Sequence, residues 1–322
     1  MIIWPAKLYL GGGLLAFLLL GCAHRLPGPD TVPALIQEFH QPAEITQVPF
    51  YPQKEYQCGP AALTIMLRHQ GLNIEPDNLV SEIYLPERHG SFQIEIMASA
   101  RTHGAVPYQI SPNLAALLSE VRAGNPVLVL QNLGLNWFPA WHYAVVVGYD
   151  LGEGNIVLRS GEIKRHVISI DLFDKTWRRA SYWGIVVLTP EHLPITADAD
   201  TYFRSLLPFS STGQWELSIR AHRTALNRWI NNKNLLVGLG NAHYSAGDLV
   251  EAERVFRQIT RAWPDFAPGL NNLAQIVYER GQPREAEMLA RKAVAIGGPF
   301  KKEFESTLIM IVNGKKSISE SD

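Results

Sequence analysis

Cysteine is nearly absent from this 322-residue chain, which contains two, Cys22 and Cys58. No Cys-x-x-Cys pair and no His-Glu-x-x-His motif occurs, so the patterns that predict a zinc site are missing. Glycine-rich phosphate-binding loops are also missing, because the glycine run at 11–13 falls inside an apolar N-terminal segment. We therefore expect neither a metal nor another cofactor.

Charge is scarce as well, and neither sign is in clear excess. The chain has 29 Lys and Arg residues against 30 Asp and Glu, a formal net charge of −1, and 18% charged residues. Proteins that bind nucleic acids carry a basic surface, and so do proteins that bind anionic membranes through polybasic segments. Neither a nucleic-acid partner nor a polybasic contact with a membrane is expected.

An apolar run lies at the N-terminus, over residues 8–20, directly after Lys7. Its length suits the core of a secretory signal peptide, whereas a membrane-spanning helix needs roughly 20 residues. The run ends in Leu-Leu-Gly-Cys at 19–22, which resembles the lipobox of bacterial lipoproteins. This resemblance implies that residues 1–21 are a signal peptide and that Cys22 is acylated. The alternative is an ordinary signal peptide in which Cys22 has no role.

Acylation would anchor the protein, because two or three acyl chains bind a bilayer stably where one chain binds only marginally. Ala23 is not the Asp that retains such lipoproteins at the inner membrane. The resemblance therefore implies an outer-membrane lipoprotein that faces the periplasm of a Gram-negative bacterium. Residues 22–46, which contain several prolines, are expected to form a tether. With Cys22 acylated, Cys58 is the one free thiol of an exported chain, and such a cysteine is a candidate reactive group.

Cys58 stands at the start of a predicted helix. Pro60 suits the first turn of a helix, an apolar run follows over 61–67, and Gly71 marks the end. The free N–H groups of a helix N-terminus favour negative charge, so they are expected to lower the pKa of the thiol. Cys58 is therefore a candidate nucleophile, and the alternative is a buried cysteine with a structural role only.

His142 stands at the start of a predicted buried strand. The following residues, 143–149, are apolar, rich in valine and free of charge. From the edge of a sheet, a histidine can face a helix N-terminus, accept the thiol proton and later protonate a leaving group. The preceding loop, 132–141, is expected to shape a cleft. Its Trp137 and Trp141 either contact substrate or are buried beside the loop.

Three short segments occur in an order that one peptidase family uses. They are Gln53, then Cys-Gly-Pro-Ala at 58–61, then His-Tyr at 142–143 before a valine-rich strand that ends in Gly-Tyr-Asp. Over residues 48–190 the chain resembles the bacteriocin-processing, double-glycine-type cysteine peptidases, which are papain-like. The resemblance implies an acyl-transfer site that acts on peptide bonds.

The resemblance also implies a role for each matched residue. Cys58 is the expected nucleophile and His142 the expected base and acid. The Gln53 side chain and the Cys58 backbone N–H are the expected oxyanion donors, in line with the need for donors where the carbonyl oxygen gains charge. Gln57 is an alternative oxyanion donor, with a less natural geometry because it directly precedes the nucleophile.

The third member of the site departs from the family pattern. The family orients its histidine with an Asp or Asn at the end of the next strand, and here Ser160 holds that place. A hydroxyl can fix the imidazole tautomer, but it cannot stabilise imidazolium as a carboxylate does. Asp150 and Glu162 are alternatives, although Asp150 also suits the turn that follows its strand. We expect a Cys–His dyad or a triad completed by Ser160.

The expected fold class for residues 47–192 is α+β, and the resemblance implies a papain-like cysteine peptidase domain. Helices come first and strands follow, an order typical of helices packed on an antiparallel sheet. After the Cys58 helix, the expected helices cover 79–85, 91–103 and 113–123, and the expected strands cover 127–131, 143–149, 156–159, 167–170 and 184–188.

A repeated pattern marks a second, all-α domain. Residues 233–266 have the spacing of a tetratricopeptide repeat, and the next unit, from Ala267, repeats its leucine, glycine and alanine positions. We expect a linker at 193–212, a tetratricopeptide repeat domain at 213–313 and a disordered tail at 314–322, with flanking helices at 214–230 and 301–312.

Together these patterns predict an exported, lipid-anchored cysteine peptidase that hydrolyses peptide bonds. Its repeats are expected to bind a peptide or protein partner, or else to be a structural appendage without a ligand. Two other functions stay open for the thiol site. The same chemistry serves an amidase or a transamidase, and a site without a carboxylate also suits an inactive pseudopeptidase that only binds a partner.

Overall fold

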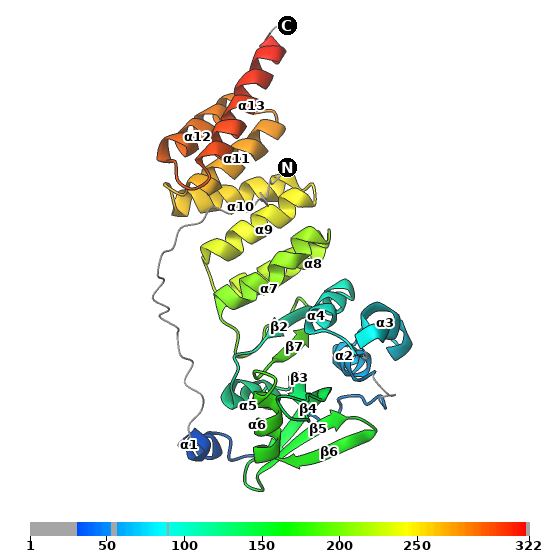
Figure 1. Cartoon of the computed structure of the whole chain (residues 1–322). Helices are drawn as coiled ribbons and strands as arrows, with labels where there is room; N and C mark the ends of the chain where they lie inside the picture. Colours follow the sequence, from blue (N-terminus) through cyan, green and yellow to red (C-terminus); the bar gives the residue numbers. More distant parts are fainter. Residues whose placement is uncertain (1–30, 53–56, 89, 320–322) are drawn as a thin grey trace, which may run out of the picture.

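The computed structural model describes residues 31–52, 57–88 and 90–319. Figure 1 shows a sheet-containing part with its helices, followed by a stack of helices that ends at α13. Several predicted features lie outside the described residues, namely the signal peptide, the acylation site Cys22 and the oxyanion donor Gln53. Within the described ranges, no helix combines the length and the apolar character needed to cross a bilayer.

One antiparallel sheet organises the first part of the chain. Its strands lie in the order β2-β7-β3-β4-β5-β6, and the short β1 pairs with β4. The central strands β3 and β4 are largely buried, because most of their residues are apolar. The strands are β1 (Ala43–Glu44), β2 (Val106–Gln109), β3 (Val127–Asn132), β4 (Trp141–Asp150), β5 (Asn155–Ser160), β6 (Ile163–Ser169) and β7 (Gly184–Leu188).

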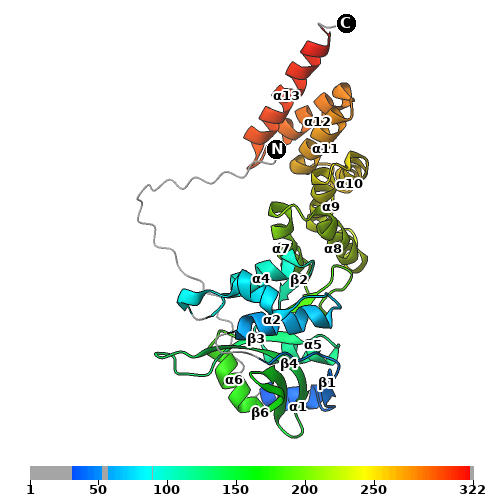
Figure 2. The same ribbon diagram turned by 90° about the vertical axis from the view of Figure 1, so that its right-hand side faces the viewer.

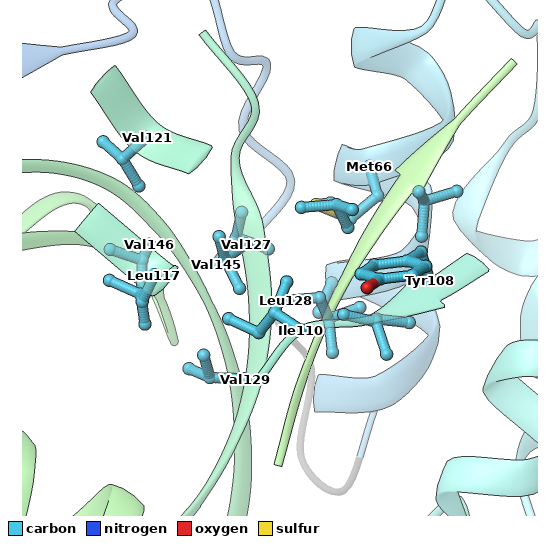
Figure 3. Close-up of a cluster of buried hydrophobic side chains, with 14 of the residues drawn as sticks. Met66, Tyr108, Ile110, Leu117, Val121, Val127, Leu128, Val129, Val145 and Val146 are labelled. Atoms are coloured by element: carbon cyan, nitrogen blue, oxygen red, sulfur yellow. The ribbon is translucent and has the colours of Figure 1, made fainter. Parts of the chain in front are cut away.

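Helices cover this sheet, and α2 (Cys58–His69) packs directly against β4. Every residue of α2 from Gly59 to Leu67 is buried, so this helix is the centre of the domain and its first residue is firmly placed. Figure 3 shows Met66 of α2 on one side of the β3 valines and Leu117 of α5 on the other. The remaining helices of this part are α1 (Thr31–Glu38), α3 (Pro76–Ile83), the 3-10 helix η1 (Pro86–Arg88), α4 (Gln93–Thr102), α5 (Leu114–Arg122) and α6 (Ile170–Arg178).

The second part is a run of antiparallel helix pairs (Figure 2). Small residues allow the helices to approach closely. A Cβ added at Gly240 of α9 would lie 2.6 Å from the Phe256 ring of α10. Gly247 and Gly281 end α9 and α11 with φ values of +81° and +79°, a conformation that glycine adopts without strain. The helices are α7 (Ala199–Ser211), α8 (Trp215–Arg228), α9 (Lys233–Ser245), α10 (Leu249–Ala262), α11 (Ala267–Glu279), α12 (Pro283–Ile296) and α13 (Lys301–Ser319).

The α+β fold of the first part and the all-α repeats of the second confirm the predicted fold class. The helices expected near 79–85, 91–103 and 113–123 are α3, α4 and α5. The strand expected at 167–170 is the end of the longer β6, and the short β2 and α6 were not expected.

Two segments are more ordered than their sequences indicate. Within residues 22–46, expected to be a tether, the structure has α1 and β1, and Phe39 beside them is 1% exposed. Within 193–212, expected to be a linker, α7 packs against β2, and Tyr202 lies 6.3 Å from Tyr108 between ring centroids. Both segments carry aromatic residues that join the main core, and this burial orders them. At the other end, α13 continues past residue 313 as far as Ser319.

The two parts share one hydrophobic cluster, because apolar residues of α7, α8 and α9 belong to the same buried core as the sheet. Glu120 of α5 strengthens the junction and is 0% exposed. Its carboxylate accepts hydrogen bonds from the Thr196 N–H at 2.8 Å, the Thr196 hydroxyl at 2.6 Å and the Asn125 amide at 2.7 Å. The chain between the sheet and α7 is therefore fixed to the first domain.

Candidate active site

The structure brings the Cys58 helix and the His142 strand together. Cys58 is the first residue of α2, and His142 is the second residue of β4. The backbone N–H of Tyr143, the residue after His142, donates a hydrogen bond to the Cys58 sulfur. One peptide unit therefore connects the sulfur to the strand that carries the imidazole.

His142 is held by the residue that sequence analysis proposed as the third member. Its Nε2 atom lies 2.8 Å from the Ser160 hydroxyl oxygen, which belongs to the last residue of β5. Strands β4 and β5 are hydrogen-bonded neighbours, and this pairing places the two side chains side by side. With Nε2 engaged, Nδ1 is the ring nitrogen that can exchange a proton with a thiol.

Burial controls the charge of both groups. Burial raises the pKa of the Cys58 thiol, although the backbone N–H groups of Tyr143, Gly59 and Cys58 itself act in the opposite direction. Burial also lowers the pKa of His142, and the nearby His166 adds to this effect. The expectation that the helix N-terminus lowers the thiol pKa is therefore wrong in its net sign, because desolvation outweighs the N–H groups. Burial therefore favours the neutral form of both groups, the thiol of Cys58 and the imidazole of His142.

The alternative site residues have other surroundings. Asp150 closes the turn after β4, where its Oδ1 accepts a hydrogen bond from the Glu153 N–H at 3.1 Å. Glu162 is exposed in the turn between β5 and β6. Gln57 is the N-cap residue of α2, and its side chain makes no capping hydrogen bond.

Some residues that shape the site were not found by sequence analysis. Tyr143 bonds Cys58 through its backbone N–H, and its hydroxyl donates to the Ser91 carbonyl at 3.1 Å. A Cβ added at Gly59 would lie 2.7 Å from the Ser91 hydroxyl oxygen, so the glycine lets this loop approach the start of α2. Ser91 is far from Cys58 in the chain and belongs to no motif, so the sequence holds no signal for the contact.

The loop between β3 and β4 forms an apolar rim. Its tip is exposed, with Trp137 82% and Phe138 74% exposed, and Trp141 beside His142 is 55% exposed. The alternative in which Trp137 and Trp141 are buried is therefore wrong. Asn132 fixes the loop, because its Oδ1 accepts from the Gly134 N–H at 2.9 Å and from the Ala140 N–H at 3.0 Å.

Two cavities border the site. One has a volume of about 350 Å³ and touches the start of α2 at Gln57 and Pro60. The other has a volume of about 430 Å³ and touches Trp141, next to His142. Among the described residues, no group of three or more His, Cys, Asp or Glu side chains is placed to hold a metal ion.

Comparisons with known proteins agree with this architecture. Residues 45–184 match the model of the Peptidase_C39 like family, and residues 270–297 match a model of the tetratricopeptide repeat. No curated protein sequence matches the chain.

Solved structures resemble each part separately. A C39-like protein of Bacillus anthracis is 17% identical, with a TM-score of 0.40, and the match covers 46% of this chain and 98% of that one. The peptidase domain of Streptococcus ComA, a bifunctional ABC transporter, is 19% identical with a TM-score of 0.36, over 44% and 99% of the two chains. The Yersinia enterocolitica chaperone SycD is 16% identical with a TM-score of 0.34, over 37% and 89%. Residues 45–184 therefore form a domain of the C39-like peptidase family, and tetratricopeptide repeats follow it in the chain.

Proposed function

We propose that this protein is a cysteine peptidase in which Cys58 attacks a peptide carbonyl and His142 moves the protons. The observation that supports this most is a chain of contacts: the Tyr143 N–H bonds the Cys58 sulfur, and the preceding residue, His142, is held by Ser160. A nucleophile and a base that is itself oriented by a third group form the recurring pattern of acyl-transfer sites.

The proposed reaction starts from the neutral pair. As a peptide displaces water, the Cys58 thiol gives its proton to His142 Nδ1 and the sulfur bonds to the carbonyl carbon. The carbonyl oxygen becomes an oxyanion, for which the Cys58 N–H and the Gln53 side chain are the proposed donors. Loss of one such donor typically lowers the rate by about 10²–10³.

His142 then returns the proton to the departing amine, and the C–N bond breaks to leave a thioester on Cys58. Water, deprotonated by His142, attacks the thioester and releases the acid, and the thiol regains its proton. Throughout, Ser160 holds Nε2 and so keeps Nδ1 directed at the reaction. Because a hydroxyl does not stabilise imidazolium as a carboxylate does, we expect a slower enzyme than one with an Asp in this place.

We further propose that the protein is exported and anchored by acyl chains on Cys22, and that it faces the periplasm from the outer membrane. The signal-peptide pattern, the lipobox resemblance and Ala23 support this proposal. A change of Cys22→Ser should release the protein from the membrane fraction while leaving the thiol site intact. Retention of the Cys22→Ser protein in the membrane fraction would contradict the proposal.

The repeats are the proposed partner site. A shallow hollow there is lined on α9 and α11 by polar groups, including Asn241, Tyr244, Asn272 and Gln275. The Tyr244 hydroxyl accepts from the Gln275 amide at 2.8 Å, and the Asn272 amide donates to the Asn241 side-chain oxygen at 3.2 Å. Carboxamides can also bond the backbone of an extended peptide, so a peptide segment of a partner or substrate is the proposed ligand.

The direct test of the peptidase proposal is cleavage of a diverse peptide library, read by mass spectrometry. We expect cleavage by the wild-type protein and none by Cys58→Ala. Identical results from both proteins would contradict the proposal. Release of ammonia or transfer to an added amine, without backbone cleavage, would instead indicate an amidase or a transamidase.

One observation favours a second candidate, a pseudopeptidase that only binds a partner. The resting thiol and imidazole are both held neutral by burial, and Ser160 offers no negative charge to change this. Under this alternative, wild-type protein and Cys58→Ala would capture the same partner equally well, and neither would cleave any peptide.

A further inference from the structure

A cavity beside the candidate site has a distinctive lining. It measures about 430 Å³ and is bordered by Asn132, Asn136, Trp141, Arg178 and Arg179. These residues come from the facing ends of β3 and β4 with their loop, and from the C-terminal end of α6, which is far away in the sequence. No Asp or Glu is among its described lining residues.

The two arginines of this cavity have no ion-pair partner within the described part of the protein. Neither Arg178 nor Arg179 forms an ion pair with a described carboxylate. Asp174, one turn before Arg178, accepts a hydrogen bond from the Tyr182 hydroxyl at 3.2 Å instead. Two guanidinium groups therefore face solvent beside a concave surface.

Part of this lining is held in place before any ligand binds. The Arg179 Nη1 atom donates to the Gly134 carbonyl at 2.8 Å, so the guanidinium is tied to the β3–β4 loop. Asn132 holds the same loop through the Gly134 and Ala140 N–H groups. Such preorganisation reduces the conformational entropy that a ligand must overcome.

The position of the cavity relates it to the substrate. Trp141 lines the cavity and directly precedes His142 on β4. His142 pairs with Gln131 of β3, whose amide donates to the Thr176 hydroxyl of α6 at 2.7 Å. Directly paired residues face the same side of a sheet, so the imidazole lies on the side that α6 covers. In the proposed reaction His142 protonates the amine that leaves, so the part of the substrate after the cleaved bond lies on the histidine side. A group bound in the cavity therefore belongs to the product that leaves with the amine.

We propose that this cavity is a subsite for a carboxylate on the leaving-group side of the substrate, a specificity that rests on the proposed peptidase function. The planar guanidinium group presents paired N–H donors that match the two oxygens of a carboxylate, and Arg178 is the group free to provide them. The rest of the cavity wall near Arg178 is formed by Arg179, Asn132 and Trp141. The carboxylate is either the C-terminus of a short substrate or an acidic side chain after the cleaved bond.

The test measures binding, so that it does not depend on catalysis. The Cys58→Ala protein is titrated with N-acetyl-Ala-Ala-Ala as the free acid and as its C-terminal amide. NMR follows the Nε–H signals of Arg178 and Arg179 and the indole N–H signal of Trp141. We expect the acid to bind about tenfold more tightly than the amide, the ratio that one charge-assisted hydrogen bond supports.

Two variants show which residue causes the preference for the acid. Arg178→Gln should remove the preference for the acid, whereas Lys175→Gln, the same charge change one turn earlier on α6, should leave it intact. A further peptide, N-acetyl-Ala-Asp-Ala amide, separates the two sources of the carboxylate. If it binds like the acid, any acidic group is accepted; if it binds like the amide, the site reads a C-terminus.

Equal affinity for acid and amide, or an acid preference that survives Arg178→Gln, would overturn the subsite. An acid preference in a protein that cleaves no peptide would support the subsite and contradict the peptidase proposal.

Discussion

Ser160 is the most informative residue to substitute. Its hydroxyl oxygen is 2.8 Å from His142 Nε2, and a carboxylate in this place would put a negative charge next to the imidazole. The informative change is Ser160→Asp. A carboxylate there would accept a charge-assisted hydrogen bond from imidazolium and oppose the burial that now lowers the pKa of His142.

The size of the effect follows from the strength of that bond. Hydrogen bonds to charged groups contribute about 1.5–3 kcal/mol, and one pKa unit corresponds to roughly 1.4 kcal/mol. The pKa of His142 should therefore rise by about one to two units in Ser160→Asp. In Ser160→Ala, His142 loses only a neutral hydrogen bond worth about 1 kcal/mol, so the pKa of His142 should change much less.

The assay is an NMR titration of the His142 Cε1–H signal in the wild type and both variants, with Ser160→Thr as a control that keeps the hydroxyl. A higher His142 pKa means that imidazolium persists to higher pH. Thiolate beside it becomes more populated, and alkylation of Cys58 in mildly acidic solution should become faster. If His142 titrates at the same pH in Ser160→Asp as in the wild type, while circular dichroism shows an intact fold, Ser160 does not control the imidazole.

Three further predictions follow from buried groups. In the form that starts at Ala23, the rate at which iodoacetamide alkylates Cys58 should rise with pH through a midpoint above the ordinary thiol pKa of about 8.5. His142→Ala should shift this midpoint little, because the imidazole is neutral at that pH. Burial lowers the pKa of His222 from 6.5 to about 4. In the pH window between these two values, the unfolded chain binds a proton that the folded protein does not. Stability should therefore fall as the pH drops through the window, by up to about 3 kcal/mol, and urea unfolding of His222→Gln should lack this slope. Glu120→Gln should destabilise the fold by about 2 kcal/mol in urea unfolding, because the buried carboxylate is the acceptor of several hydrogen bonds.

Each of these has a clear contrary result. A low-pH plateau of alkylation that disappears in His142→Ala would show a preformed ion pair. The same acid slope in His222→Gln as in the wild type would place the responsible group elsewhere. An unfolding midpoint for Glu120→Gln equal to that of the wild type would mean that the bonds at the domain junction are replaced by water without loss.

Local sequence patterns predicted the main helices and strands well. Pro60 and the apolar run after Cys58 mark α2, and the charge-free run after His142 marks β4, because helix starts and buried strands depend on neighbouring residues. The repeat spacing identified α9 to α12 for the same reason. Ser160 was predicted from the resemblance to the peptidase family, which has its third residue at the end of the strand after that of the histidine.

Features that depend on distant contacts were missed. α7 and β1 are ordered by burial against strands far away in the sequence, and a proline-containing segment gives no local sign of this. The sign of the thiol pKa was also missed, because it depends on the depth of burial rather than on the helix N-terminus alone. The arginine-lined cavity joins the end of α6 to the β3–β4 loop, a contact that no motif encodes.

The proposed mechanism requires that Cys58 forms a covalent acyl intermediate with a substrate. The most direct measurement is intact-protein mass spectrometry after rapid acid quench of the protein with a cleavable peptide or an activated peptide ester. We predict a mass increase equal to the acyl group, located on Cys58, that is greatly reduced in His142→Ala and absent in Cys58→Ala. Turnover without any adduct on Cys58, or an adduct that forms equally well without His142, would contradict this mechanism.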